Sequence, residues 1–181
     1  MKTYIENPNP ELYSLLKWLK GNVSTDDSRP VLQAINIKRN RIEATTGYAL
    51  VIAMLEAPIK FYADLDDGLW IIETVTKKLA ILSTLDEGNF PDVDVIATGL
   101  HLNDKHVCLC FNPNIFKNVT EGFQRVYVNA PAYNAPMEIM LYPDGTYPDG
   151  TYLAIVMPML SDVPIEAVMT DAFSKLVSDK S

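Results

Sequence analysis

The chain alternates between short segments with one apolar face and short segments rich in β-branched and aromatic residues. Residues 11–20 belong to the first kind, and their apolar positions are Leu12, Leu15, Leu16 and Leu19. This spacing is typical of a helix with one buried face, and Lys17 and Lys20 fall outside the apolar stripe. Pro10 suits the first turn of such a helix and Gly21 suits its end, so we predict about three helical turns here.

A β-rich pattern follows in two runs. They cover residues 31–37 and 41–55, and a polar turn at residues 38–40 separates them. Runs of β-branched residues on either side of a short polar turn predict strands.

A third strand is predicted at residues 59–65. The Asp-Asp-Gly sequence at residues 66–68 is typical of a turn, which makes residues 69–75 the expected hairpin partner. Residues 74–85 fit either a short helix or a strand, and residues 86–99 indicate a loop.

The second half of the chain repeats this order. A strand is expected at residues 106–111 and a helix at residues 112–123, with Asn-Pro at its start as in the first helix. Three further predicted strands lie at residues 124–130, 136–142 and 151–157. The pattern predicts an α+β fold of two βαβββ halves, with two helices packed on antiparallel sheet, in a single domain at residues 1–160.

Two features lie outside this pattern. Residues 143–152 repeat Pro-Asp-Gly-Thr-Tyr in tandem, which indicates a lengthened hairpin turn without a function of its own. Residues 161–181 form a predicted amphipathic helical extension, whose apolar face holds Ile165, Val168, Met169, Ala172, Leu176 and Val177. Such a helix either packs on its own domain or serves as a partner-binding or self-blocking segment.

Composition narrows the functional classes. With 15 basic and 23 acidic residues the chain carries a formal charge of −8, which argues against a protein that coats nucleic acid indiscriminately. No run approaches the ~18 apolar residues of a membrane span, and residues 1–10 show no apolar signal-peptide centre, so we expect a cytoplasmic protein with no membrane contact.

Candidate chemistry is sparse. Zinc-ligating residue types occur close together, but not with paired ligands across a turn, at His101, His106, Cys108 and Cys110. Acidic groups that could attract a hard cation, Asp64, Asp66, Asp67, Asp92 and Asp94, fit solvated turns better. Only two histidines occur and no nucleophile or phosphate-binding motif is present, so we predict neither an enzyme nor a cofactor.

Three blocks, in order, resemble the bacterial DNA sliding clamp, the β subunit of DNA polymerase III. Residues 29–55 resemble its R-P-x-L and A-T-D-G-H-R-L strands, residues 89–96 resemble its F-P-D-Y segment, and residues 111–160 end in a sequence similar to V-V-M-P-M-R-L. Thr46, Tyr48 and Ala49 replace the Asp, His and Arg of the family. The resemblance implies a single clamp-like domain, whereas the clamp protomer has three, so a ring would need a homo-oligomer.

The resemblance also implies two surfaces. Clamp helices present basic side chains to double-stranded DNA without reading its sequence, which points here to Lys17, Lys20, Lys117 and Arg125. Glu11 and Glu121 share those helix surfaces. A clamp pocket for peptides of DNA polymerase or the clamp loader corresponds to Thr45, Gly47, Tyr48, Leu50, Ile155, Met157 and Pro158. In the family the two contributing motifs come from neighbouring domains.

The expected function is therefore that of a sliding-clamp-like accessory protein in DNA replication or repair, which tethers a polymerase or docks clamp-binding peptides. The alternative is a clamp-like regulator or decoy, from a phage or mobile element, that binds replication proteins without encircling DNA. The acidic charge and the extra segment after residue 160 favour this alternative.

Overall fold

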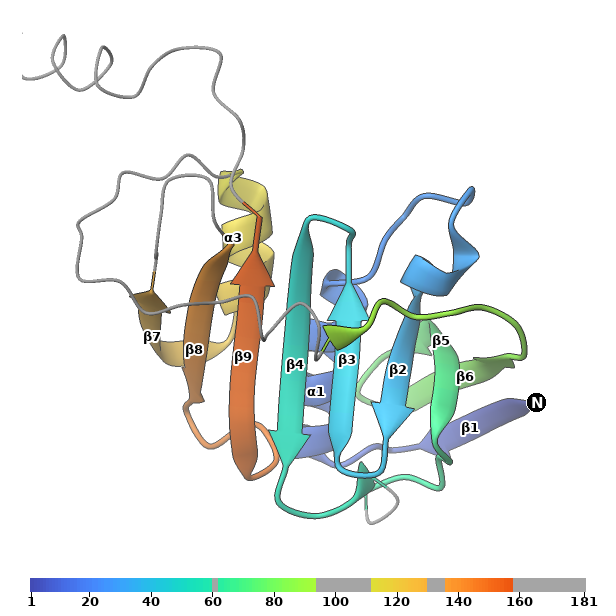
Figure 1. Ribbon diagram of the computed structural model, residues 1–181. Helices are drawn as coiled ribbons and strands as arrows, with labels where there is room; N and C mark the ends of the chain where they lie inside the picture. Colours follow the sequence, from blue (N-terminus) through green and yellow to red (C-terminus); the bar gives the residue numbers. More distant parts are fainter. Residues whose placement is uncertain (60–61, 94–111, 130–135, 158–181) are drawn as a thin grey trace, which may run out of the picture.

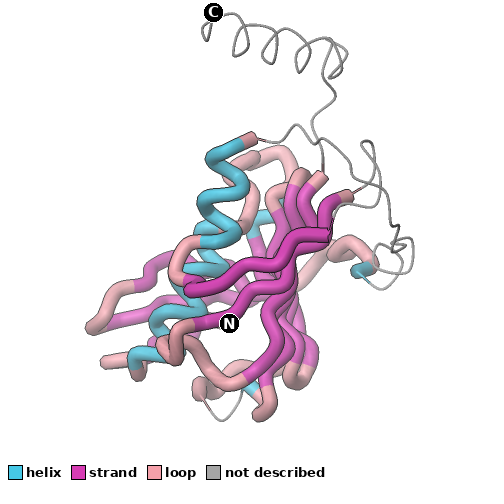
Figure 2. The backbone as a smooth tube through the Cα atoms, turned by 90° about the vertical axis from the view of Figure 1, so that its left-hand side faces the viewer, coloured by secondary structure: helices cyan, strands magenta, loops and turns pink. Residues whose placement is uncertain are grey.

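The computed structural model describes residues 1–59, 62–93, 112–129 and 136–157. In this part of the chain, nine strands form one sheet in the order β1-β6-β5-β2-β3-β4-β9-β8-β7, and each strand is antiparallel to its neighbours. Helices α1 (Pro10–Gly21) and α3 (Pro113–Thr120) lie together on one face of the sheet (Figure 1, Figure 2).

The strands are β1 (Lys2–Glu6), β2 (Ala34–Lys38), β3 (Arg41–Thr45), β4 (Ala49–Leu55), β5 (Gly68–Val75), β6 (Leu79–Leu85), β7 (Phe123–Asn129), β8 (Met137–Pro143) and β9 (Gly150–Val156). The helices are α1 (Pro10–Gly21), the short 3-10 helix η1 (Pro30–Gln33) and α3 (Pro113–Thr120).

Helix α1 begins as the sequence predicts. The side chain of Asn9 accepts a hydrogen bond from the Leu12 amide at 2.7 Å, and Pro10 occupies the first turn, where it costs no backbone bond. The leucine stripe is fully buried against the sheet. Asn112 and Pro113 start α3 in the same way, since the Asn112 side chain accepts from the Asn114 amide at 2.9 Å.

The main core lies between the helices and the sheet, and Trp18 is at its centre. The Trp18 indole donates to the Val119 carbonyl at 2.9 Å, which ties α1 to α3. Its ring makes edge contacts with Phe123, Tyr147 and Tyr152. This aromatic cluster joins the first helix to the strands of the second half.

The two halves share one sheet because β4 pairs with β9 over seven residue pairs, from Ala49↔Val156 to Leu55↔Gly150. At the end of this pairing, a Cβ on Gly150 would lie 2.2 Å from the Met54 carbonyl oxygen. Only glycine allows the backbones to approach this closely.

The other face of the sheet, which we call the outer face, is partly covered by residues 86–93. This segment follows β6 and runs across β2 and β3 on the side opposite α1 (Figure 1). Its Phe90 and Val93 pack on a second cluster made of Leu50, Ile52 and Ile155.

The same outer face holds a buried charge. Glu43 on β3 is fully buried, accepts a hydrogen bond from the Asn36 amide group at 2.7 Å and pairs with the Arg41 guanidinium at 2.5 Å. A buried carboxylate is tolerated when a cation and a hydrogen-bond donor both satisfy it.

These observations confirm the predicted α+β fold, with helices packed on antiparallel sheet. Helix 11–20, the helix that starts at Asn112-Pro113 and the three strands after it are present, and the run at residues 41–55 divides into β3 and β4. The predicted strand at residues 106–111 lies outside the described residues.

The strand predicted at residues 59–65 is wrong for the described residues of that range, 59 and 62–65. The amides of Tyr62 and Ala63 donate to the Ile59 carbonyl at 2.8 and 2.9 Å, which is a turn and not an extended strand. The buried side chains of Ile59, Ala63 and Leu65 anchor this turn in the core. The hairpin partner of β5 is instead β6, so residues 79–85 form a strand.

No helix in the described part of the chain is long and apolar enough to cross a membrane. The predicted division at residue 160 stays a prediction, since residues 158–181 lie outside the described ranges.

We expect Gly150→Ala to destabilise the protein by about 1–3 kcal/mol, because the added methyl group collides with the β4 backbone. Gly21→Ala is the control, since a Cβ there meets nothing within 4 Å. The free energy of unfolding in urea measures both. Equal stabilities of the two variants would show that β4 and β9 are not this close.

Candidate functional site

The first group of predicted pocket residues lies at the turn between β3 and β4. The Thr45 hydroxyl donates to the Ala49 carbonyl at 2.8 Å and accepts from the Gly47 amide at 3.0 Å. Gly47 has φ +89°, a conformation that side-chain-bearing residues rarely adopt. Thr45 is buried, so it shapes this turn from inside and does not itself face a partner.

The second group lies on β9, directly beside the first. Ile155 is the cross-strand partner of Leu50, and the Met157 amide donates to the Tyr48 carbonyl at 2.8 Å. The two motifs are therefore brought together within one chain, at one end of the β4–β9 pair. Pro158 lies outside the described residues.

We call Tyr48, Leu50, Ile155 and Met157 the β4–β9 surface. Leu50 and Ile155 form its floor and are almost fully buried, because Phe90 and Val93 pack beside them. Tyr48 and Met157 form its rim, with 62% and 47% of their surfaces exposed. The accessible part of the surface is thus an aromatic ring and a flexible thioether over an apolar floor.

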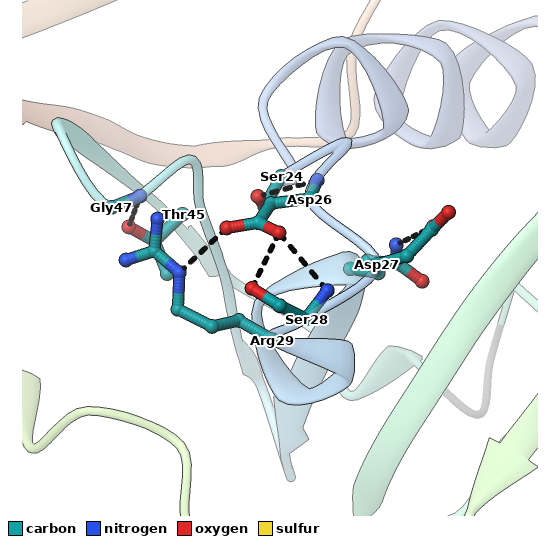
Figure 3. A network of polar contacts seen from close by, with 8 residues as sticks. Ser24, Asp26, Asp27, Ser28, Arg29, Thr45 and Gly47 are labelled. Carbon is teal, nitrogen blue, oxygen red and sulfur yellow. Dashed lines mark hydrogen bonds and ion pairs between the residues drawn. The ribbon is translucent and has the colours of Figure 1, made fainter.

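A cation that we did not predict as part of the site lies next to this turn. Figure 3 shows the Arg29 guanidinium beside Thr45 and Gly47, and its Nη1 atom would be 3.6 Å from a Cβ on Gly47. Asp26 accepts from Arg29 Nε at 3.0 Å and from the Ser28 hydroxyl at 2.6 Å.

The loop that holds Arg29 is ordered by these contacts. The hydrogen bonds from the Ser28 side chain, the Ser28 amide and Arg29 keep the pKa of Asp26 below its ordinary value. Asp26 therefore stays charged and fixes the guanidinium at neutral pH. In the sequence, the Asp-Asp-Ser-Arg run before Pro30 is typical of a turn that side-chain hydrogen bonds stabilise. This run was the pattern from which the ordered loop around Arg29 could have been predicted.

The four predicted DNA-binding residues do not form one surface. Lys17 pairs with Glu121 at 3.5 Å, and the Lys20 ammonium donates to the Glu73 carbonyl at 2.6 Å. Lys117 is exposed on α3. Arg125 is the cross-strand partner of Tyr142, which alternates with the core residue Leu141 and so lies on the outer face, away from the helices.

A cavity of about 210 Å³ lies on the helix side of the sheet, between α1, α3 and the turn from β8 to β9. Lys17 and Glu121 line it, and none of the predicted pocket residues does.

The candidate metal ligands that lie in the described part of the chain do not form a metal-binding cluster. Within the described ranges, no three His, Cys, Asp or Glu side chains converge to hold an ion. Asp67 instead accepts a hydrogen bond from the Arg39 amide at 2.6 Å. His101, His106, Cys108, Cys110 and Asp94 lie outside those ranges.

The likeness to solved structures defines the class of fold. The chain is similar to a candidate DNA polymerase III β subunit from Eubacterium rectale (11% identity, TM-score 0.53, 88% of this chain and 65% of that chain). It is also similar to the Helicobacter pylori β clamp bound to a DNA ligase peptide (12% identity, TM-score 0.52, 87% of this chain and 66% of that chain). The β sliding clamp of C. crescentus is a third match (12% identity, TM-score 0.51, 88% of this chain and 65% of that chain).

The fold is thus that of the bacterial DNA sliding clamp. This chain spans slightly less than two thirds of the clamp chains it matches. No protein-family model matches the sequence, and the search of curated proteins gave no match.

We expect Thr45→Val to destabilise the protein by about 1–2 kcal/mol, because it removes both hydrogen bonds that shape the turn while keeping the side-chain volume. Thr151→Val, at an exposed position of β9, is the control and should change stability by less than about 0.5 kcal/mol. Urea unfolding compares the two. A Thr45→Val protein as stable as the wild type would contradict the role given to this hydroxyl.

Proposed function

We propose that this protein is a clamp-like accessory factor, and not an enzyme, that docks short peptides of DNA replication or repair proteins on the β4–β9 surface. The observation that carries the proposal is the pairing of Leu50 with Ile155. Motifs that the clamp family takes from neighbouring domains are adjacent strands here.

The chemistry of the surface suits an apolar peptide anchor. An apolar side chain of a peptide that packs against Tyr48 and Met157 would remove their exposed apolar surface from water. Leu50 and Ile155 beside them are already buried and exclude water from the contact. Methionine adapts its shape to different side chains, which suits a site for several partners.

One neighbouring group, Arg29, adds polar recognition. The turn at Thr45 and Gly47 holds the strand ends in place, and Arg29 offers a cation beside it. The H. pylori clamp that this chain resembles in fold was solved with a DNA ligase peptide, which supports a peptide as the class of ligand. Peptides of DNA polymerase and of the clamp loader belong to the same class.

A second candidate function is a regulator or decoy that binds replication proteins without encircling DNA. The dispersed cations favour it: Lys17 is paired with Glu121, and Arg125 lies on the opposite face from the helices. Non-specific DNA binding needs several cations that together follow the phosphate backbone. The formal charge of −8 adds a general repulsion.

We expect the wild-type protein to bind a fluorescent peptide that carries a clamp-binding motif of a DNA ligase or polymerase. Met157→Asp should weaken this binding at least about tenfold, because a carboxylate would replace an apolar rim contact. Fluorescence anisotropy gives both affinities.

Met54→Asp is the matched control for that experiment. Met54 is also an exposed methionine of the outer face, 37% exposed, but it lies at the other end of β4, opposite Thr151. Its substitution should leave the affinity unchanged. Equal losses in the two variants, or no loss in Met157→Asp, would reject the β4–β9 surface as the docking site.

The two candidate functions predict different DNA binding and different molecular masses of the protein in solution. A ring-forming clamp would scatter light with a mass several times 20.2 kDa and would be retained on circular DNA. We expect no assembly of this kind, and duplex DNA binding that disappears by about 200 mM salt because few cations are aligned. A multimer that stays on closed circular DNA but leaves linear DNA would reject the non-encircling function.

A further inference from the structure

Strands β7, β8 and β9 carry a second apolar area on the outer face, which we call the shelf: Tyr127, Met140, Tyr142 and Leu153. The rings of Tyr127 and Tyr142 meet edge to face at 5.3 Å, and the Tyr142 hydroxyl donates to the Met140 sulfur at 2.8 Å. Tyr127 remains 60% exposed, and Met140 and Tyr142 are exposed as well.

The strand register places all four side chains on the same face. Tyr127 is opposite Met140, and Met140 is opposite Leu153, which packs on the outer-face cluster. Their neighbours Val126 and Ile139 point the other way, into the main core. The shelf is therefore contiguous.

The shelf adjoins the part of the outer face that residues 86–93 cover, and it meets that part at Leu153. Phe90 and Val93 belong to the cluster of Leu50, Ile52 and Ile155 on β4 and β9, whose apolar members in the described residues include no side chain of β7 or β8. A contiguous exposed patch that contains two tyrosines and a methionine is unusual in a soluble domain unless something binds there.

The chain itself contains a segment of matching character. Residues 165–177 place apolar side chains at helical spacing, and the stripe consists of Ile165, Val168, Met169, Ala172, Phe173, Leu176 and Val177. A helix of this length is marginal in water and gains its stability by packing its apolar face on a surface.

The length of this predicted helix and the reach of the linker before it also match the shelf. Thirteen residues of helix are about 20 Å long and about 10 Å wide, which is close to the area of three seven-residue strands. The linker at residues 158–164 leaves β9 at Met157 and spans up to about 25 Å when extended, more than enough to reach any shelf residue.

We propose that residues 165–177 form an amphipathic helix that packs on the shelf of the same chain. The covalent link gives this helix a millimolar effective concentration, so it outcompetes a second copy or a free partner. The proposal does not depend on peptide docking at the β4–β9 surface.

Hydrogen–deuterium exchange of the full-length protein, read by mass spectrometry, tests the proposal. Amides in residues 165–177 should exchange more slowly than in an unstructured peptide. Tyr127→Asp should raise their exchange about tenfold, since it removes one buried aromatic contact from the shelf. Met169→Asp, on the tail side of the contact, should have the same effect.

Val128→Asp is the matched control. Val128 is the next residue of β7, is 48% exposed and lies on the opposite face, so its substitution should leave the exchange of residues 165–177 unchanged. Dilution of the protein should also change nothing. Exchange at unstructured rates in the wild type, protection unaffected by Tyr127→Asp, or protection lost on dilution would each overturn the proposal, the last by showing that a second copy is the occupant.

Discussion

The pairing of β4 with β9 is the contact on which the rest of this protein depends. It connects strands that are about a hundred residues apart in the chain, and it makes one sheet from two halves that each have a helix and at least three strands. The helices can share a core only because this sheet is continuous beneath them. Trp18, which contacts residues from α3, β7 and β9, reinforces the same junction from the helix side.

The junction also decides what the outer face can do. Leu50 and Ile155 meet across it, and Phe90 and Val93 cover them from a segment that follows the β5–β6 hairpin. The buried charge of this face lies nearer β3, where Glu43 is held by Arg41 and Asn36. The apolar areas that remain accessible therefore lie on and beyond the β4–β9 pair, which is where both proposals place a ligand.

The sequence alone was sufficient to predict the helices and strands in which apolar residues recur with a clear period. The leucine stripe of α1 and the β-branched runs of β2 to β4 predicted their elements because burial on one face leaves a regular trace in the chain. The same reasoning failed at residues 59–65, where Ile59, Ala63 and Leu65 are buried but belong to an irregular turn. Buried side chains alone do not distinguish an anchored turn from a strand.

The candidate site could be predicted only in part. The resemblance to the clamp identified the residues of the β4–β9 surface, but their contact within one chain depends on strand order, which no local pattern contains. Arg125 was placed with the helix lysines because it follows α3 closely in sequence. The irregular pairing between Phe123 and Arg125 and the alternation of β7 put it on the other face instead.

The duplicated pentapeptide shows how a copied sequence can acquire two different structural roles. The first copy forms the turn after β8, and its Gly145 uses a positive φ, whereas the second begins β9 and its Gly150 allows close contact with β4. Tyr147 stacks on Phe123 and donates to the Glu121 carbonyl, while Tyr152 is fully buried beside Trp18. Burial raises the pKa of Tyr147 to about 12, so its phenol stays neutral in the core. A tandem duplication in a gene would thus have supplied a second core tyrosine in one step, and its later loss by recombination would cost the fold an aromatic side chain and not merely shorten a loop.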